Sequence, residues 1–520
     1  MPDTVALFVM VLTLGVLAFL VPFAFHRTML LLLSGRSRSE HVALWPEEQL
    51  PRVTVQLPIY NERHVVARLI DHACQIDYPA SLLEVQVLDD SDDSTALLAK
   101  RRVAYWQARG VDVVHMARGT REGFKAGALA DGTAVAKGEY PLVLDADFIA
   151  PAGLVRDLLP PFRDETVGMV QARWDHLNRD ETWFTEAQSL LLDGHFLFEQ
   201  GGRYTGDRFF NFNGTVGVWR RACLEGAGGW QSDTLTEDLD LSYRAQMIGW
   251  RFVYLDHVSV PAEIPSTVEA LEVQQRRWAQ GGIQTARKIL PRLLRGSYSL
   301  KVKAEAVIRL CGHVAHPLTW ALALLLFPSA VARRALGFEQ YLLIDLLIFA
   351  AATFPFMVFY WSAGCRRGHM GFRLARGVAR TLALGIGLTV PVTRAVFRGR
   401  TGTSDPFVRT PKKGEASGDL YPRMAAWPDL MATYLVLALA GGYWGQLPFI
   451  LLFATGYSGL ALPALFPACG PGVAPSCGER GGDGTRSFQT SAASMASKMR
   501  NGTQSRRRTR TGCDQTPVSW

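Results

Sequence analysis

Long apolar runs open the chain and return in its last third. Residues 4–25 carry no charge, and a bilayer is crossed by about 20 apolar residues. Basic residues such as Arg27 and Arg36 follow this run, so the positive-inside rule places the N-terminus outside and the next segment in the cytoplasm. The run is too long for the core of a signal peptide and lacks a basic n-region. We therefore predict an N-terminal transmembrane helix within residues 1–30.

Between residues 50 and 290 the pattern changes to that of a globular α/β domain. Short apolar strands such as VTVQLPI and EVQVLDD alternate with helical stretches such as residues 63–76. This alternation predicts βαβ units and a mainly parallel sheet. Ligands bind at the carboxyl edge of such a sheet, so polar residues that end its strands are the first candidates for a site.

After residue 300 the apolar runs resume and continue to residue 465. Residues 310–332 and 341–364 each predict one membrane span, and residues 430–465 predict two spans with a break near Gly441. Together with the N-terminal helix, this makes about five spans.

Residues 381–397 are the exception within this region. The stretch is short and contains Pro391 and Arg394, so we predict a helix that lies in the membrane interface rather than crossing it. Both basic segments that flank it then stay on the cytoplasmic side. Residues 466–520 are rich in Gly, Ser, Thr and Arg, and we predict a disordered tail there because they cannot bury a core.

Charge and cysteine content narrow the class of protein. The net charge is +8, and Arg stands beside the apolar runs, which favours an anionic membrane surface. The sequence has neither zinc-finger spacing nor a continuous basic helix, so we expect no nucleic-acid partner. The seven cysteines are scattered without C-x-x-C spacing, which predicts neither a metal site nor a disulfide framework and agrees with a reducing cytoplasm.

Acidic residues stand at the ends of two predicted strands. Asp89 and Asp90 end EVQVLDD, and Asp145 and Asp147 end YPLVLDADF. Two carboxylates spaced i, i+2 can address one divalent cation that also binds a diphosphate, which is the kind of site Mg²⁺ favours. Asp is also common in turns, so the pattern gains weight only with the motifs that follow it.

Two further motifs stand after these strands. In TLTEDLDL, Glu237 and Asp238 open a predicted helix. They could be plain N-cap residues, or Asp238 could take the proton from an attacking hydroxyl. Arg277 of QQRRW can hold a leaving diphosphate by paired hydrogen bonds. Trp278 offers a flat apolar face to a sugar ring, although a core position is its ordinary role.

In these motifs, present in order, the chain resembles the processive family 2 glycosyltransferases, which include cellulose synthase and the mannan-synthase-like proteins. The runs RGTREGFKAGAL, FFNFNGTVGVWR and FVRTPKKG are similar to the mannan-synthase-like branch. The resemblance extends over about residues 50–465. It implies a GT-A type nucleotide-sugar-binding domain, residues 50–290, inserted between transmembrane helices.

The resemblance also implies a role for each motif residue. Asp89 and Asp90 would contact the nucleotide, Lys125 would lie near it, and Asp145 and Asp147 would hold Mg²⁺ or Mn²⁺ with the diphosphate. Asp238 would be the general base. The remaining substrate-binding positions would be Glu237, Gln274, Arg277 and Trp278, joined by Thr410 and Lys412 of a gating-type loop over residues 404–414, for which a basic surface loop is the alternative.

The function these features predict is inverting transfer of a hexose from a nucleotide sugar, GDP-mannose or UDP-glucose, to a growing β-linked polysaccharide. We expect a multi-pass protein of the inner cell membrane with its catalytic domain in the cytoplasm. Its partners would be the nucleotide-sugar donor, the polysaccharide acceptor and the lipid bilayer. Two alternatives stay open: a glycolipid-forming enzyme resembling ceramide glucosyltransferase, and a non-catalytic membrane scaffold. The acidic positions are all intact, which argues against the scaffold.

Overall fold

The described part of the chain forms one compact unit. The computed structural model describes residues 1–36, 44–338, 342–401, 426–444 and 447–465. All of them belong to a single unit, Met1–Pro467. The tail 466–520 and the loop 404–414, with Thr410 and Lys412, lie outside the described residues.

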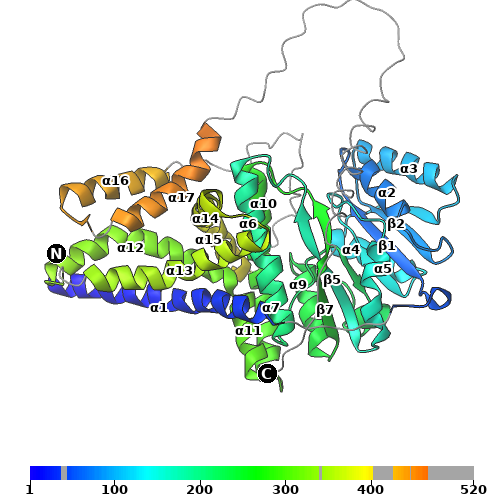
Figure 1. Cartoon of the computed structure of the whole chain (residues 1–520), viewed down its shortest axis with the longest axis horizontal. Coiled ribbons are helices and arrows are strands. Elements are labelled where there is room, and N and C mark those ends of the chain that lie inside the picture. The colour runs from blue at the N-terminus through cyan, green and yellow to red at the C-terminus, as the bar shows by residue number, and fades with distance from the viewer. Residues whose placement is uncertain (37–43, 339–341, 402–425, 445–446, 466–520) are drawn as a thin grey trace, which may run out of the picture. The chain divides into compact units, whose positions relative to one another are not determined.

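A mixed seven-stranded sheet forms the centre of the α/β domain (Figure 1). The strand order is β3-β2-β1-β4-β6-β5-β7. Four of the six neighbouring pairs are parallel, and β6 runs antiparallel between β4 and β5. The strands are β1 (Val53–Ile59), β2 (Leu83–Asp89), β3 (Val113–Ala117), β4 (Tyr140–Val143), β5 (Val167–His176), β6 (Gly217–Trp219) and β7 (Arg251–Ala262). The predicted α/β class and mainly parallel sheet are confirmed.

The central strands are buried along almost their whole length. Every residue of β2 is buried, as is every residue of β1 except Pro58. Near-continuous burial is typical of parallel strands covered on both faces. The polar residues in these strands therefore pair with each other: the Thr54 hydroxyl donates to Glu84 over 2.7 Å, and Gln56 donates to Gln86 over 3.1 Å.

Short helices cover the sheet and connect its strands. They are α2 (Val66–Cys74), α3 (Ser94–Gln107), α4 (Phe124–Val135), α5 (Leu154–Leu158) and α8 (Arg221–Gly226), with 3₁₀ turns at Glu47–Gln49 and Pro160–Arg163. Local caps fix some of their ends. The Asp93 side chain, for example, accepts a hydrogen bond of 2.8 Å from the backbone N–H of Thr95 at the start of α3.

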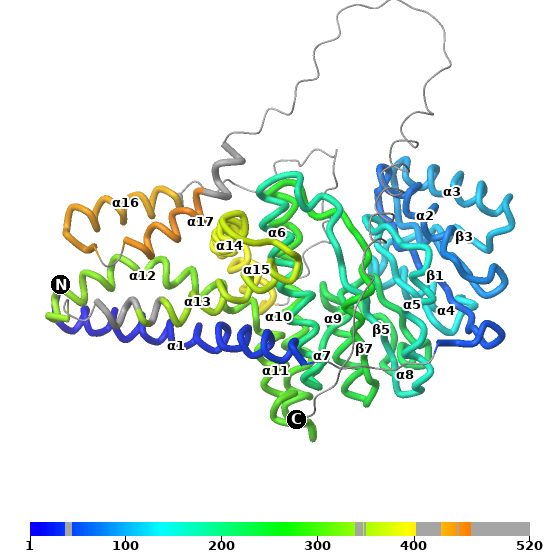
Figure 2. Tube along the Cα trace, in the orientation of Figure 1, coloured from blue at the N-terminus to red at the C-terminus, as the bar shows by residue number. Residues whose placement is uncertain are grey.

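A second group of helices connects the sheet to the apolar part of the chain (Figure 2). It consists of α6 (Trp183–Gly194), the π-helix η3 (His195–Gln200), α7 (Gly201–Thr205), α9 (Glu237–Met247), α10 (Val268–Arg295) and α11 (Leu300–Leu310). Helix α1 (Asp3–Ser34) packs on η3 and α7, and α15 (Thr389–Thr401) packs on α10. The α/β domain is thus in direct contact with helices that precede it and helices that follow it in the sequence.

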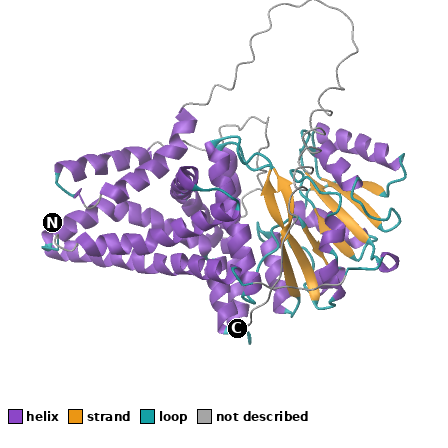
Figure 3. Ribbon diagram, viewed as in Figure 1, coloured by secondary structure: helices purple, strands orange, loops and turns teal. Residues whose placement is uncertain are grey.

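The remaining helices are predominantly apolar and gather apart from the strands (Figure 3). They are the 3₁₀ turn η4 (Gly312–Val314), α12 (Ala315–Ala335), α13 (Leu342–Arg366), α14 (Gly371–Gly387), α16 (Ala426–Ala440) and α17 (Leu447–Leu465). In the described residues, Asp3–Ser34 and Gly312–Ala335 are long and apolar enough to cross a bilayer. Helices α14 and α15 meet at a bend of 44°, and the pair makes a third span if the two helices together cross the bilayer once.

The expected boundaries agree in part with these helices. The predicted spans at 1–30 and 310–332 fall on Asp3–Ser34 and Gly312–Ala335. The stretch predicted as one interfacial helix, 381–397, is divided between α14 and α15 at Leu388. The total of five spans stays a prediction.

Candidate functional site

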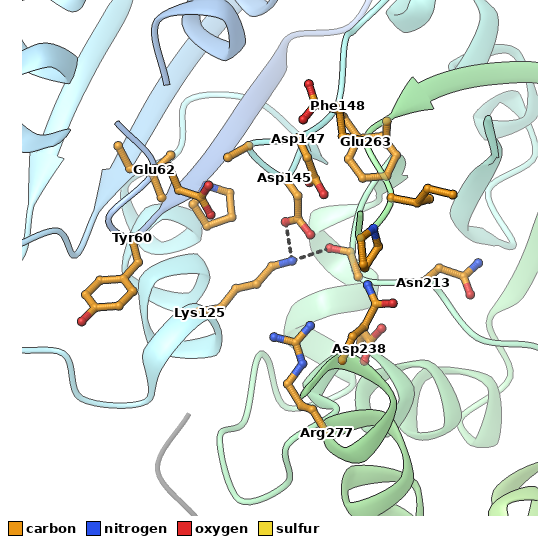
Figure 4. Close-up of a pocket in the computed structure, with 18 of the residues that line it drawn as sticks. Tyr60, Glu62, Lys125, Asp145, Asp147, Phe148, Asn213, Asp238, Glu263 and Arg277 are labelled. Carbon is orange, nitrogen blue, oxygen red and sulfur yellow. Dashed lines mark hydrogen bonds and ion pairs between the residues drawn. The ribbon is translucent and has the colours of Figure 1, made fainter. Parts of the chain in front are cut away.

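A cavity of about 300 Å³ lies at the carboxyl edge of the sheet, where β1, β2 and β4 end (Figure 4). Residues from each of the acidic motifs and from QQRRW line it, together with Lys125. They are Asp90, Lys125, Asp145, Asp147, Glu237, Asp238, Gln274, Arg277 and Trp278. Segments from residue 90 to residue 278 thus meet in one cavity, as the rule for open α/β sheets requires.

Lys125 lies at the centre of the charged part of this cavity. Its Nζ atom donates to Oδ1 of Asp145 at 2.5 Å and to the backbone carbonyl of Gly214 at 2.9 Å (Figure 4). Burial alone would lower the pKa of Lys125, but Asp145, Glu237 and Asp238 outweigh it and raise the pKa. Lys125 is therefore a fixed positive charge between the acidic motifs.

The backbone at Gly214 passes close to the Asp238 carboxylate. Its φ is +83°, and a Cβ atom at this position would lie 3.2 Å from Oδ2 of Asp238. The Oγ1 atom of the next residue, Thr215, accepts a hydrogen bond of 2.8 Å from the backbone N–H of Asp145. Gly214 and Thr215 therefore contact both acidic motifs, and a side chain at Gly214 would crowd the Asp238 carboxylate.

The pKa of the Asp238 carboxyl is raised toward neutral pH. Burial and the neighbouring Glu237 carboxylate raise its pKa to about 7, against the lowering effect of Lys125 and Arg277. A base with a pKa near neutral pH is half deprotonated and still accepts a proton readily. The N-cap of α9 is Thr236, without a side-chain cap bond, and the Asp238 carboxylate accepts from the adjacent Leu239 N–H at 2.8 Å in the first turn. A plain N-cap does not account for this residue.

The two aspartates after β2 differ in position. Asp90 lines the cavity and is held by Arg118 through two hydrogen bonds of 2.6 and 2.7 Å. Asp89 is 2% exposed and lies behind it, accepting from His115 at 2.7 Å and from Ser91 N–H at 2.8 Å. Burial would raise the pKa of Asp89, but these hydrogen bonds outweigh it and lower the pKa. Asp90 is thus placed to touch a ligand, and Asp89 to support it.

Asp145 and Asp147 fit a site for a divalent cation, in which a diphosphate would supply further oxygen ligands. Both carboxylates line the same cavity, and the Asp145 side chain is 34% exposed. Two hard oxygen donors together with phosphate oxygens are the ligand set that Mg²⁺ and Mn²⁺ accept. In the part of the chain that the structure describes, no three His, Cys, Asp or Glu residues form a metal-binding group.

Helix α10 forms another wall of the cavity. The Thr267 hydroxyl caps its start by accepting from Ala270 N–H at 3.3 Å, and the helix then presents Gln274, Arg277 and Trp278 to the cavity. In Figure 4 the Arg277 guanidinium extends toward Lys125 and Asp238. The QQRRW motif therefore lies within the acidic site.

Several lining residues were not identified from sequence motifs. Arg121 stacks on the Tyr60 ring, with 3.3 Å from its Cζ atom to the ring centroid, beside the nucleotide-side motif. Trp174, His176, Asn213 and Glu263 line the other half of the cavity. Trp174 and His176 lie at the end of β5, and Glu263 directly follows β7, whereas Asn213 belongs to the run FFNFNGTVGVWR.

Comparison with known proteins decides the family of this domain. The model "Glycosyltransferase like family 2" matches residues 51–281. This segment is a family 2 glycosyltransferase domain. It contains the whole sheet, the acidic motifs and QQRRW.

Plant glucomannan mannosyltransferases are among the curated relatives that match. Probable glucomannan 4-beta-mannosyltransferase 11 from Oryza sativa subsp. japonica is 40% identical over 249 residues, which are 47% of this chain and 44% of the relative. Glucomannan 4-beta-mannosyltransferase 1 from the same organism is 38% identical over 290 residues, 54% of this chain and 56% of the relative. The chain spans about half the length of the curated relatives it matches. The resemblance to the cellulose-synthase-like group is confirmed.

Among solved structures, the mannosyltransferase PcManGT from Pyrobaculum calidifontis, in complex with GDP-Man and Mn²⁺, is similar with a TM-score of 0.46 and 21% identity. The similarity covers 70% of this chain and 98% of that chain.

Proposed function

We propose that this chain is a membrane-embedded, inverting glycosyltransferase that extends a β-linked mannan or glucomannan from a nucleotide sugar. The observation that carries this proposal is the convergence of Asp145, Lys125 and Asp238 in one cavity at the carboxyl edge of the sheet. A base, a cation-binding pair and two positive side chains are the parts that displacement of a diphosphate from a sugar requires.

In the proposed reaction, Asp238 accepts the proton of an acceptor hydroxyl as its oxygen attacks the anomeric carbon of the donor. The bond between that carbon and the diphosphate oxygen breaks in the same step, so the configuration inverts without a covalent enzyme intermediate. Lys125 and Arg277 stabilise the negative charge that develops on the leaving diphosphate. A bound Mg²⁺ or Mn²⁺, held by Asp145 and Asp147, would neutralise part of that charge.

The donor and acceptor follow from the relatives and from the two ends of the cavity. These relatives are named as glucomannan 4-beta-mannosyltransferases, which favours GDP-mannose over UDP-glucose as the donor. Asp90, Tyr60 and Arg121 would receive the nucleotide, and Gln274 with Trp278 the acceptor. Thr410 and Lys412 would close over the diphosphate as part of a gating loop.

The membrane part of the proposal rests on the apolar helices. Two to three described helices meet the length and composition for a span, and the five-span topology puts the catalytic domain in the cytoplasm, where nucleotide sugars are made. Helix α10 contacts α15 and α17, so an acceptor at Trp278 would lie close to the helix bundle. The polymer would leave through this bundle.

The test is a panel of radiolabelled GDP-mannose, UDP-glucose and other donors on membranes that contain the protein, followed by linkage analysis of the product. A long β-1,4-linked polymer that requires Mg²⁺ or Mn²⁺ supports the proposal. The double variant Asp145→Asn, Asp147→Asn should be inactive, and the exposed control Asp180→Asn should be active. Label only in a single-sugar, organic-soluble lipid would favour the glycolipid enzyme, and full activity in excess chelator would refute the cation site.

A further inference from the structure

One wall of the cavity contains polar side chains with unused hydrogen-bonding capacity. Trp174 and His176 stand two positions apart on β5, so they point to the same face of the sheet, and Asn213 precedes β6. The Nε1 atom of Trp174, both ring nitrogens of His176 and the Nδ2 atom of Asn213 are buried and have no partner among the described residues. His176 is only 7% exposed. Buried polar groups are nearly always satisfied, so this wall lacks its natural hydrogen-bond partner.

The orientation of the Asn213 amide is fixed by groups outside the cavity. Arg309 is a pure donor and donates to Oδ1 of Asn211 at 2.8 and 3.2 Å. Asn211 must therefore turn its Nδ2 atom to its other neighbour, and it donates to Oδ1 of Asn213 at 3.1 Å. The His195 Nε2 atom lies 3.2 Å from the same oxygen. With its oxygen occupied in this way, Asn213 has only its N–H groups left for a ligand.

Trp174, His176 and Asn213 share one surface of the cavity, and Trp174 and Asn213 are connected behind it through η3. The Trp174 ring packs on Phe196 with 5.0 Å between centroids, and Phe196 packs on His195 at 4.9 Å. His195 in turn contacts Asn213, as described above. The surface is held by the π-helix η3, which contains both His195 and Phe196. Single π-turns within helices are frequent at functional sites.

The surface lies on the side of the cavity away from the nucleotide motifs. Tyr60 and Asp90 follow β1 and β2, which neighbour each other in one half of the sheet, whereas β6 and β5 are neighbours in the other half. Asp145 and Asp147 follow β4, between the two halves. Asn213 adjoins Gly214, whose position touches the Asp238 carboxylate. A ligand on this surface would therefore lie on the far side of the diphosphate site and beside the base.

We propose that Trp174, His176 and Asn213 bind the hydroxyl groups of the acceptor sugar that Asp238 deprotonates. This inference rests on the proposed function and adds residues that position the acceptor. The wall offers uncharged donors and an aromatic ring, which suit a neutral, hydroxyl-rich ring with an apolar face. A phosphate or nucleotide would instead call for the cations on the other side of the cavity.

The charge state of His176 supports a neutral sugar as the ligand. Burial lowers its pKa to about 4, with Asp193 and Asp175 opposing and Arg179 and Arg367 contributing to the lowering. His176 is thus an uncharged imidazole at neutral pH, with one donor and one acceptor nitrogen. Such a ring can bind a hydroxyl group in either direction.

The test measures kinetic constants of the full chain in membranes, with radiolabelled GDP-mannose as donor and β-1,4-mannohexaose as acceptor. Trp174→Phe removes the indole N–H and keeps an aromatic ring, and His176→Phe and Asn213→Leu remove the other polar groups. Each change should raise the acceptor KM about threefold to tenfold, as expected for one neutral hydrogen bond, and leave the donor KM and the donor hydrolysis without acceptor unchanged.

Trp230→Phe is the matched control. Trp230 is also a tryptophan whose Nε1 atom is buried and lacks a partner in the described chain, but it does not line the cavity. An unchanged acceptor KM in all three cavity variants overturns the inference, as does an equal change in Trp230→Phe or an equal rise in the donor KM. If membranes with the wild-type protein make no polymer from GDP-mannose and transfer no mannose to the oligosaccharide, the proposed function fails as well. An unchanged donor KM also shows that each variant is folded.

Discussion

The Nζ atom of Lys125 lies 2.5 Å from Oδ1 of Asp145, so a buried ammonium is paired with the first carboxylate of the D-x-D motif. The same ammonium contributes to the field at Asp238, whose pKa it lowers against the effect of burial. Lys125 therefore couples the site of the diphosphate to the site of proton transfer. This coupling can be measured from the pH dependence of the reaction.

We expect kcat/KM of the wild-type protein to rise through pH about 7, because Asp238 must be deprotonated to act as the base and its pKa is raised to about 7. In Lys125→Met the loss of the positive charge raises the pKa of Asp238 further. The acid limb of the profile should then move to higher pH. The measurement is initial rate against pH at subsaturating acceptor.

Lys137→Met serves as the control for this experiment. Lys137 also pairs with a carboxylate, Asp112 at 2.7 Å, but on the surface and outside the cavity. The acid limb of the pH profile of Lys137→Met should coincide with that of the wild type. If the acid limb of Lys125→Met stays at the pH of the wild type, Lys125 does not lower the pKa of Asp238.

Asp238→Asn keeps the shape of the side chain and removes the base. Transfer should fall by about 10² to 10⁴-fold, the usual contribution of general base catalysis. Donor affinity, measured by binding of labelled nucleotide sugar, should stay near that of the wild type, because Asp238 is expected to act on the acceptor. Equal losses in donor affinity and rate would make Asp238 a binding residue instead.

Gly214→Ala tests the close approach of the backbone to the base. A Cβ atom would lie 3.2 Å from Oδ2 of Asp238 and would also be strained by the φ of +83°. We expect a loss of about 1 kcal/mol in stability and a 10- to 100-fold loss of transfer from the displaced carboxylate. Gly110→Ala has almost the same φ, +82°, with no atom within 4 Å.

Gly110→Ala is the control: its loss of stability should be similar, and its transfer activity should be retained. Thermal unfolding and initial rates of both variants separate strain from displacement. Equal rates in Gly110→Ala and Gly214→Ala would mean that Asp238 tolerates the methyl group.

The acidic and QQRRW motifs were predictable from the sequence because each follows a local rule. Asp145 and Asp147 come directly after a buried strand, and the order of βαβ units brings such strand ends to one edge. The mixed character of the sheet was not predictable in the same way. Strand β6 has only three residues, Gly217–Trp219, which is too short for an alternating pattern to show its direction.

The polar wall of the cavity could not be predicted because its properties arise from distant parts of the chain. Asn213 is a functional candidate only because its oxygen is already occupied, and this depends on Arg309, 98 residues from the Asn211 that it orients. His176 is notable only because tertiary packing leaves its nitrogens without partners. Local sequence reports residue type, whereas unmet hydrogen-bonding capacity is a property of the fold.

The last prediction concerns the contact between the first helix and the catalytic domain. Glu305 on α11 is 2% exposed and accepts from Arg203 at 2.7 Å, and the His26 ring of α1 lies 2.9 Å away. Burial would raise the pKa of Glu305, but Arg203 and His26 outweigh it and hold the pKa at about 2. The carboxylate therefore contributes stability that is complete above its ordinary pKa of 4.5 and is lost as the pH falls through about 2.

Glu305→Gln removes this charge and leaves the buried Arg203 without its nearest carboxylate. Breaking a buried ion pair in this way should reduce the free energy of unfolding by about 3 kcal/mol, measured by unfolding of the purified protein in detergent at pH 7. Glu225→Gln is the control, since the Glu225 side chain is 66% exposed and pairs with Arg221 at 3.5 Å, and such a surface pair contributes less than about 1 kcal/mol. Because Glu305 connects α11 to α1, the variant should lose stability more than it loses donor affinity. Equal stability of the two variants would show that this contact does not hold the first helix to the domain.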